Sequence, residues 1–131
     1  MIRKLVIISN YLPDEQESML RFSELMISGV SSKGVRVDII QPIERVGKLR
    51  RFLPALEKWL FYIDKYLFFP FDLMAYFSKQ KGDDNAVYHI TDHSNAIYAL
   101  LFNKKPLVVT CHDVLAIRSA MGEIQIGRAH V

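Results

Sequence analysis

The stretch Pro106-Leu107-Val108-Val109-Thr110-Cys111-His112-Asp113 decides the fold of this chain. Its apolar and β-branched residues predict a short buried strand, and a Cys-His-Asp tripeptide follows them. A second apolar run, residues 86–90, ends in the same way, in Thr91-Asp92-His93-Ser94. Because the carboxyl ends of parallel strands meet at one edge of a sheet, we expect the two His-Asp pairs to face a single cleft.

The residues before these two strands predict further β-α-β units. Residues 5–8 form a continuous apolar run, typical of a central parallel strand, and residues 35–40 form the next strand. Between them we expect a helix that starts with Asp14 as N-cap and Glu17 as its capping-box partner and stops at Gly34. Its buried stripe has helical spacing and comprises Met19, Phe22, Met26 and Val30. A further helix, capped by Asp92 or Ser94, would bury Ala96, Ile97, Leu100 and Leu101. Strands that alternate with helices in this way predict an α/β, Rossmann-like, doubly wound parallel sheet.

Residues 45–80 differ from the rest, and we interpret them as an aromatic helical insertion. Pro54 suits a first helical turn, and a stripe of Leu56, Trp59, Leu60 and Ile63 follows it. We expect Pro70 to interrupt this helix, and a second helix to continue with Phe71, Met74 and either Phe77 or Ala75. The insertion would pack against its own sheet or against another domain. Alternatively, residues 45–77 would rest on an anionic membrane surface through the basic residues Arg45, Lys48, Arg50, Arg51 and Lys58.

Length and composition exclude several classes of protein. The chain has 131 residues, which is the size of one domain, and its net charge of +3 is too mild and too scattered for a nucleic-acid binder. One cysteine excludes an internal disulfide and fits a reducing, cytoplasmic compartment. No apolar stretch is long enough to cross a membrane. Residues 125–131 match what read-through into a common sequencing adapter would encode, so we expect the natural domain to occupy residues 1–124 and exclude Arg128 and His130.

The candidate chemistry is of the acid–base type. A histidine at this edge of the sheet could take a proton from a hydroxyl, and a neighbouring carboxylate could orient its ring. We therefore rank His112 with Asp113 first and Asp92 with His93 second, and we expect a structural role for His89. Cys111 and His112 would point to opposite faces of a strand, so Cys111 is predicted to be a small core residue and no thiolate nucleophile.

Phosphate and metal sites are not predicted. The first loop, residues 9–13, has no glycine, and the acids after it would repel a phosphate group at the helix start. No ligand spacing in the chain is diagnostic of a metal. The sequence contains no G-x-S-x-G nucleophile elbow, which counts against a hydrolase.

The chain resembles the N-terminal half-domain of GT-B glycosyltransferases of the family 4 (glycogen synthase-like) group. The resemblance extends to about Gly122, with little contribution from residues 43–80. It rests on Tyr11-Leu12-Pro13 with Gln16-Glu17-Ser18-Met19, on Lys33-Gly34-Val35-Arg36-Val37, on Val87-Tyr88-His89-Ile90-Thr91-Asp92-His93-Ser94 and on Val108-Val109-Thr110-Cys111-His112-Asp113-Val114. The glycine-rich first loop common in that group is absent.

The resemblance implies a retaining transferase that moves a sugar from a nucleotide-sugar donor to an acceptor hydroxyl, without an obligatory metal or other cofactor. This chain would be a fragment that supplies the acceptor side, and most of the donor would bind to a C-terminal domain that lies outside it. His112 would position or stabilise the reacting sugar, and Asp113 would orient His112 or start the next helix. Asn10, Tyr11 and Ser18 would line the acceptor side, with Asp92 and His93 nearby. A lipid-linked acceptor would place the protein peripherally at the inner membrane face. The alternative is a non-catalytic α/β ligand-binding or receiver-like module.

Overall fold

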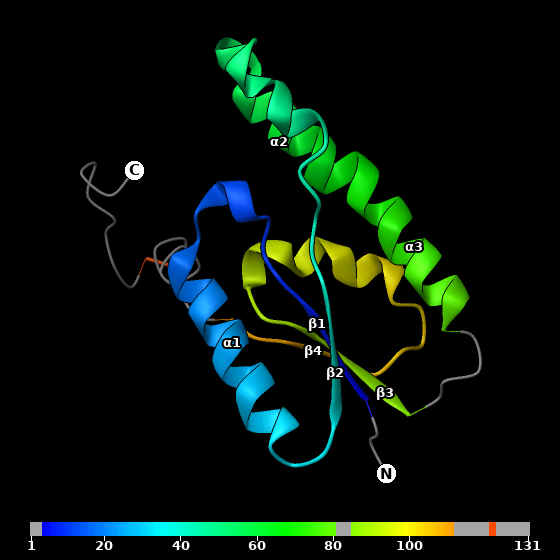
Figure 1. Ribbon diagram of the computed structural model, residues 1–131. Helices are drawn as coiled ribbons and strands as arrows, with labels where there is room; N and C mark the ends of the chain where they lie inside the picture. The colour runs from blue at the N-terminus through cyan, green and yellow to red at the C-terminus, as the bar shows by residue number, and fades with distance from the viewer. Residues whose placement is uncertain (1–3, 81–84, 112–120, 123–131) are drawn as a thin grey trace.

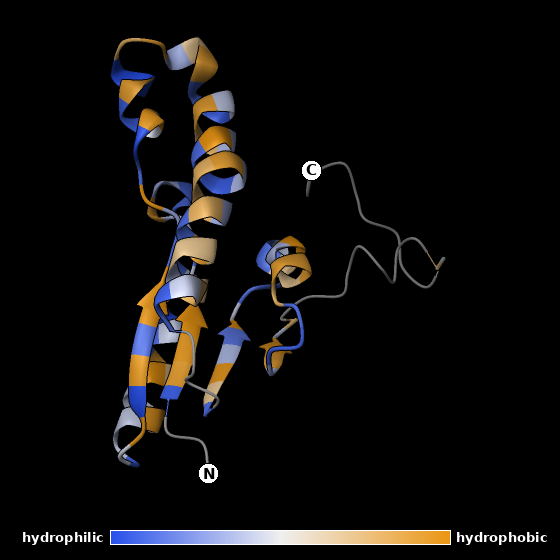
Figure 2. Ribbon diagram, turned by 90° about the vertical axis from the view of Figure 1, so that its right-hand side faces the viewer, coloured by the Kyte–Doolittle hydropathy of each residue, from blue (hydrophilic) through white to orange (hydrophobic). Residues whose placement is uncertain are grey.

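The computed structural model describes residues 4–80, 85–111 and 121–122 of the chain. Four parallel strands form one sheet in the order β2-β1-β3-β4. The strands are β1 (Lys4–Ile8), β2 (Arg36–Ile40), β3 (Ala86–Ile90) and β4 (Leu107–Val109). All of them point toward the same edge of the sheet, which is the upper edge in Figure 2. The prediction of an α/β fold built on a parallel sheet is therefore confirmed.

Helices lie on both sides of this sheet (Figure 1). Helix α1 (Glu17–Ser31) covers one face, and α3 (Phe69–Lys79) covers the other. The 3₁₀ helix η5 (His93–Leu101) lies with α3, because Tyr98 belongs to the same core cluster as Phe69 and Phe77. The connection β1-α1-β2 moves the chain to one side of β1, and β3 then lies on its other side. Right-handed crossovers in opposite directions place helices on opposite faces, which explains the two layers.

The main core lies between the sheet and α3. Alternate residues of the two central strands supply Val6, Ile8, Tyr88 and Ile90, and all four are buried. The ring of Phe77 contacts the ring of Tyr88 edge-on, with centroids 5.4 Å apart. Such pairs add about 0.5–1.5 kcal/mol beyond the burial of their apolar area. This packing fixes the carboxyl ends of β1 and β3 side by side.

A single helical rod runs from Glu57 to Lys79, so the prediction that Pro70 interrupts the helix is wrong. The rod consists of α2 (Glu57–Ile63), the π-helical turn η4 (Asp64–Phe68) and α3. Pro70 lies in the first turn of α3, directly after η4. The Phe69 N–H donates to the Asp64 carbonyl five residues earlier. This wider turn makes room for the proline ring, which would otherwise clash with a carbonyl in the preceding turn.

The rod extends past the sheet as an arm, which we define as residues 46–68. Besides α2 and η4, the arm contains two 3₁₀ helices, η2 (Val46–Arg51) and η3 (Pro54–Leu56), which lead from the sheet to its outer end. The arm rises from the carboxyl edge of the sheet (Figures 1 and 2). Leu60 is buried, but Leu56, Trp59 and Ile63 of the predicted stripe are exposed. In α3 the buried residues are Phe69, Leu73 and Phe77, whereas Phe71 and Met74 are exposed and Ala75 is exposed as well.

Other local predictions have mixed outcomes. A short 3₁₀ helix, η1 (Leu12–Asp14), absorbs Asp14, so α1 begins only at Glu17 and no side chain caps it. The expected capping box is therefore wrong. The expected stripe of α1, Met19, Phe22, Met26 and Val30, is half-buried. Gly34 (φ 79°) follows the helix in the left-handed conformation that favours glycine. Cys111 is exposed, so its predicted place in the core is wrong.

Candidate functional site

The two central strands mark the point at which the direction of the sheet reverses. From β1 the chain passes to β2 on one side, and later strands continue on the other side through β3 and β4. In open α/β sheets, ligands bind outside the carboxyl ends of the two strands at such a switch point. Here the residues that follow these strands are Ser9 and Asn10 after β1, and Thr91 and Asp92 after β3, and all four are buried.

Asn10 and Asp92 contact each other across this point. The Asn10 amide nitrogen donates to Oδ2 of Asp92 at 2.7 Å, and the two side chains come from positions 82 residues apart in the chain. Asp92 also caps η5, because it accepts from the Ser94 backbone N–H at 3.1 Å and from the Ser94 hydroxyl at 2.7 Å. The ring nitrogen Nδ1 of His93 lies 3.5 Å from Oδ1 of Asp92. Of the two predicted caps, Asp92 and Ser94, the structure uses Asp92.

These contacts determine the charge of Asp92. Burial alone would raise the pKa of this carboxyl group, but the hydrogen bonds from Asn10 and Ser94, together with His93, outweigh burial and hold the pKa below its ordinary value. Asp92 is therefore a carboxylate at neutral pH. In that state it accepts hydrogen bonds and does not donate a proton.

Two buried amide atoms at this site have no hydrogen-bond partner among the described residues. They are Oδ1 of Asn10 and Nδ2 of Asn95. The bond to Asp92 fixes the orientation of the Asn10 amide, because only its nitrogen can donate to a carboxylate. A buried polar atom without a partner costs about 1–3 kcal/mol. An acceptor on Asn10 and a donor on Asn95 therefore lack partners of the kind that a hydroxyl group supplies.

The α1 side of the same edge is also polar. The Ser23 and Thr91 hydroxyls lie 2.9 Å apart in a hydrogen bond, and both residues are buried. A hollow of about 170 Å³ opens beside them, lined by Ser9, Leu12, Leu20, Ser23, Glu24, Ile27, Ile39 and Gln41. Sequence reasoning missed Ser23, Thr91 and Asn95. For Ser23 a signal exists, since this hydroxyl occupies the stripe that Met19, Phe22 and Met26 define.

The structure brings together only some of the predicted site residues. Asn10, Asp92 and His93 meet at the switch point, where the His93 side chain is 44% exposed. Ser18 lies on the exposed surface of α1. His89 is buried in β3, and its Nε2 is 2.6 Å from the Thr110 hydroxyl, in keeping with the structural role expected for it. His112 and Asp113 lie outside the described residues, so their roles stay predictions.

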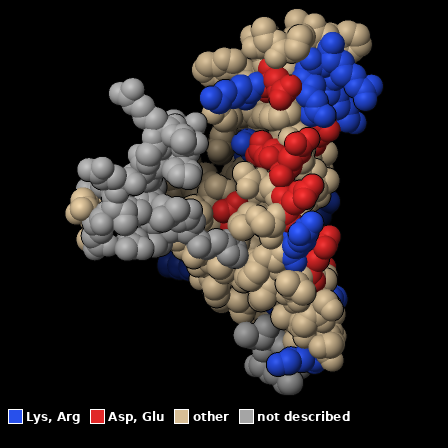
Figure 3. All heavy atoms as spheres, turned by 90° about the vertical axis from the view of Figure 1, so that its left-hand side faces the viewer, with Lys and Arg blue, Asp and Glu red and all other residues tan. Residues whose placement is uncertain are grey.

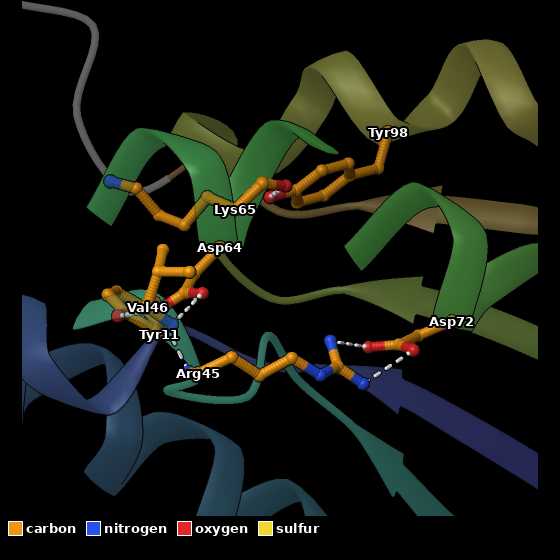
Figure 4. Close-up of polar contacts among 7 residues, drawn as sticks. All are labelled: Tyr11, Arg45, Val46, Asp64, Lys65, Asp72 and Tyr98. Carbon is orange, nitrogen blue, oxygen red and sulfur yellow. Dashed lines mark hydrogen bonds and ion pairs between the residues drawn. The ribbon is translucent and has the colours of Figure 1, made fainter. Parts of the chain in front are cut away.

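Tyr11 contacts the base of the arm (Figure 4), whereas Asn10, Asp92 and His93 meet at the switch point. It is buried, and its hydroxyl donates to Oδ2 of Asp64 at 2.6 Å. Burial and the neighbouring Asp64 raise the pKa of Tyr11 far above its ordinary value, so it keeps its proton. Asp64 is fully buried and also accepts from the backbone N–H groups of Arg45, Val46 and Gly47 at 2.9–3.0 Å. Tyr11 thus ties the first loop to the base of the arm.

Further contacts fix the base of the arm. Tyr98 of η5 donates to the carbonyl of Lys65 at 2.7 Å. Within the helix this carbonyl has lost its usual donors, since the Phe69 N–H bonds to Asp64 and Pro70 has no N–H. The Lys65 ammonium group pairs with Asp14 at 2.8 Å, and Arg45 forms a bidentate pair with Asp72. The arm is therefore held by the first loop, by the segment after β2 and by η5.

The described residues contain no group of three or more metal-ligating side chains, and no helix among them is long and apolar enough to cross a membrane. Comparison of the chain with protein-family models, with curated proteins and with solved structures finds no match.

Proposed function

We propose that this chain forms the acceptor side of a retaining glycosyltransferase, which transfers a sugar from a nucleotide-sugar donor to an acceptor hydroxyl. One observation carries the proposal: two buried amide atoms have no partner among the described residues, an acceptor on Asn10, which bonds to the Asp92 carboxylate, and a donor on Asn95, whose backbone N–H bonds to the Asp92 carbonyl. A sugar hydroxyl donates and accepts hydrogen bonds at once, so it suits an acceptor and a donor that both lack a partner.

The charge of the site favours the acceptor sugar over the donor. Asp92 is ionised, and the described residues that lower its pKa, Asn10, Ser94 and His93, include no lysine or arginine. A carboxylate in this position repels the diphosphate of a nucleotide sugar. The donor would therefore bind mainly to a second α/β domain outside this chain. His112 would position or stabilise the reacting sugar there, and Asp113 would orient it.

Titration of the isotope-labelled chain with simple methyl glycosides, followed by amide NMR shifts, tests the acceptor site. We expect shifts centred on residues 9–11 and 91–96, with affinity in the millimolar range that a few hydrogen bonds give. Asn10→Ala should lower this affinity about tenfold, the equivalent of about 1.4 kcal/mol. Asn103→Ala, at an exposed asparagine after η5, is the matched control and should change nothing. Binding of inorganic phosphate but of no glycoside would contradict the proposal.

A non-catalytic ligand-binding module is the second candidate. It is favoured by the state of Asp92, whose hydrogen bonds and lowered pKa leave it no proton to transfer. A receiver-like module is less favoured, because Ser9 and Asn10 follow β1 where such a module needs acidic residues.

Donor turnover by the complete protein separates the two candidates. In a transferase, His112→Ala should reduce turnover while leaving glycoside binding and the unfolding midpoint nearly unchanged. Glycoside binding without turnover of any donor would favour the binding module.

A further inference from the structure

The outer end of the arm combines exposed apolar side chains with positive charge. Between residues 49 and 59, five large apolar side chains are exposed: Phe52 at 80%, Trp59 at 66%, and Leu49, Leu53 and Leu56 at 44–45%. The sheet and its helices do not cover this surface, because the arm rises beyond them (Figure 1). An exposed apolar patch of this kind marks a site of interaction with another surface.

Cations are concentrated at the same end. Residues 44–59 contain five basic residues, Arg45, Lys48, Arg50, Arg51 and Lys58, and two acidic ones, Glu44 and Glu57. Figure 3 shows lysine and arginine side chains gathered at the tip and acidic side chains below it. Arg50 pairs with Glu44 at 2.8 Å, and Arg45 pairs with Asp72. Within the part of the chain that the structure describes, Lys48, Arg51 and Lys58 form no ion pair and are exposed.

The two kinds of side chain also share one hollow. It has a volume of about 420 Å³, and its lining consists of Glu44, Lys48, Leu49, Arg50, Arg51 and Phe52. Arg50 and Glu44 of this lining form an ion pair, which leaves Lys48 and Arg51 as cations with no ion pair among the described residues. Two such cations beside two apolar side chains suit a phosphate-bearing head group above the start of an acyl chain. Tryptophan and phenylalanine prefer this depth of a bilayer, at the boundary between head groups and hydrocarbon.

We propose that the tip of the arm, residues 48–59, docks on the surface of an anionic phospholipid bilayer. Nucleic acid is a poorer match, because most of the exposed apolar side chains are leucines, which do not stack on bases. The contacts of Tyr11, Arg45–Gly47 and Tyr98 at the base of the arm hold it in one orientation. The carboxyl edge of the sheet, with the switch-point residues, faces the same way as the arm (Figure 2). A docked tip would thus bring Asn10 and Asp92 toward the bilayer.

Vesicle flotation of the whole chain tests this docking. We expect the chain to float with vesicles that contain about 30 mol% phosphatidylglycerol and to stay behind with pure phosphatidylcholine, since each cation near an anionic surface contributes about 1 kcal/mol. Neutralising two tip cations together, Lys48→Gln with Arg51→Gln, should lower the partition coefficient about 30-fold, which corresponds to about 2 kcal/mol. The double variant Lys33→Gln with Lys79→Gln removes the same charge from two exposed lysines, one just after α1 and one at the C-terminal end of α3. It should bind like the unmodified chain.

The only tryptophan of the chain, Trp59, lies in the tip, so its fluorescence provides a second, direct measurement of docking. Its fluorescence should shift to the blue on anionic vesicles and be quenched by brominated acyl chains, because the indole enters the interface. Equal loss of binding in both double variants, or no blue shift at saturating vesicle, would overturn the proposal. So would tight binding of single-stranded RNA with no binding of vesicles. The glycoside titration contains no lipid, so failure of the docking and failure of the acceptor site are distinguishable.

Discussion

Replacing Tyr11 with phenylalanine removes one hydroxyl and tests whether this residue serves the fold or the acceptor. The hydroxyl is buried and donates to the fully buried Asp64 at 2.6 Å. A hydrogen bond to a carboxylate contributes about 1.5–3 kcal/mol, and the three backbone donors of Asp64 cannot replace it, because each is already engaged. We therefore expect Tyr11→Phe to lower the free energy of unfolding by about 2 kcal/mol. With a urea dependence of about 2 kcal/mol per molar, the midpoint falls by about 1 M.

Urea unfolding followed by far-ultraviolet circular dichroism measures this loss. Tyr62→Phe is the matched control, because Tyr62 is a partly exposed arm residue whose hydroxyl bonds to none of the described residues, and its midpoint should barely move. Asp64→Asn should cost more than Tyr11→Phe, about 3 kcal/mol, because an amide nitrogen then faces a backbone N–H. Tyr11→Phe as mild as Tyr62→Phe, combined with weaker glycoside binding, would refute the structural role and return Tyr11 to the acceptor side.

Three further predictions concern the fold around the site. Gly47→Ala should destabilise the chain by about 1–3 kcal/mol in urea unfolding, because a Cβ would collide with the Tyr11 hydroxyl and lie 2.9 Å from Oδ2 of Asp64. Gly29→Ala, at a position on α1 with open space around it, is the control and should be neutral or stabilising. Equal effects of the two substitutions would contradict the packing argument. Tyr98→Phe should cost about 1–2 kcal/mol in the same assay by leaving the Lys65 carbonyl without a donor, and a loss below about 0.3 kcal/mol would mean that water replaces the tyrosine. The pKa of Asp92 is lowered by folding, so its stabilising contribution is complete above its unfolded value of 3.8 and is lost as pH falls through the lower folded value. The unfolding free energy should thus decrease in acid below about pH 4, less steeply in Asp92→Asn than in the unmodified chain, with Asp38 supplying a remaining dependence of the same sign.

The sheet could be predicted because its signal is local. Runs such as Leu5-Val6-Ile7-Ile8 are apolar at every position, as a strand covered on both faces requires, and the polar residues after β1 and β3 reveal the carboxyl edge. Asp92 and His93 follow from the same pattern, whereas Asn10 is expected from the resemblance alone. Asn95 does not, because a polar residue in the first turn of a helix is ordinary. What distinguishes it is a buried side-chain nitrogen that has no hydrogen-bond partner among the described residues.

The structure of the arm could not be predicted from the sequence. A proline within an apolar helical pattern usually marks a break, but here a π turn and the Tyr98 hydroxyl, 33 residues away, compensate for it. Exposed and buried stripes also have the same helical spacing, so Leu56, Trp59 and Ile63 could not be told from core residues. Asp64 gave no sign of its role, because its partner Tyr11 lies 53 positions earlier.

The number of residues in the rod also determines which way the tip of the arm points. A π turn is an α-helix that holds one residue more than its turn requires. Because the π turn holds its extra residue locally, removing one residue from Asp64–Phe68 would restore regular α-helical geometry with little rotation. Removing one residue from the regular helix at residues 60–63 would instead turn everything before it by about 100° relative to α3. The composition of the tip would be unchanged, but its basic and apolar side chains would face another direction. The direction of the tip relative to the switch point is therefore set by the number of residues in the rod. Deletion of a single codon can change this direction without altering any residue of the tip or of the switch point.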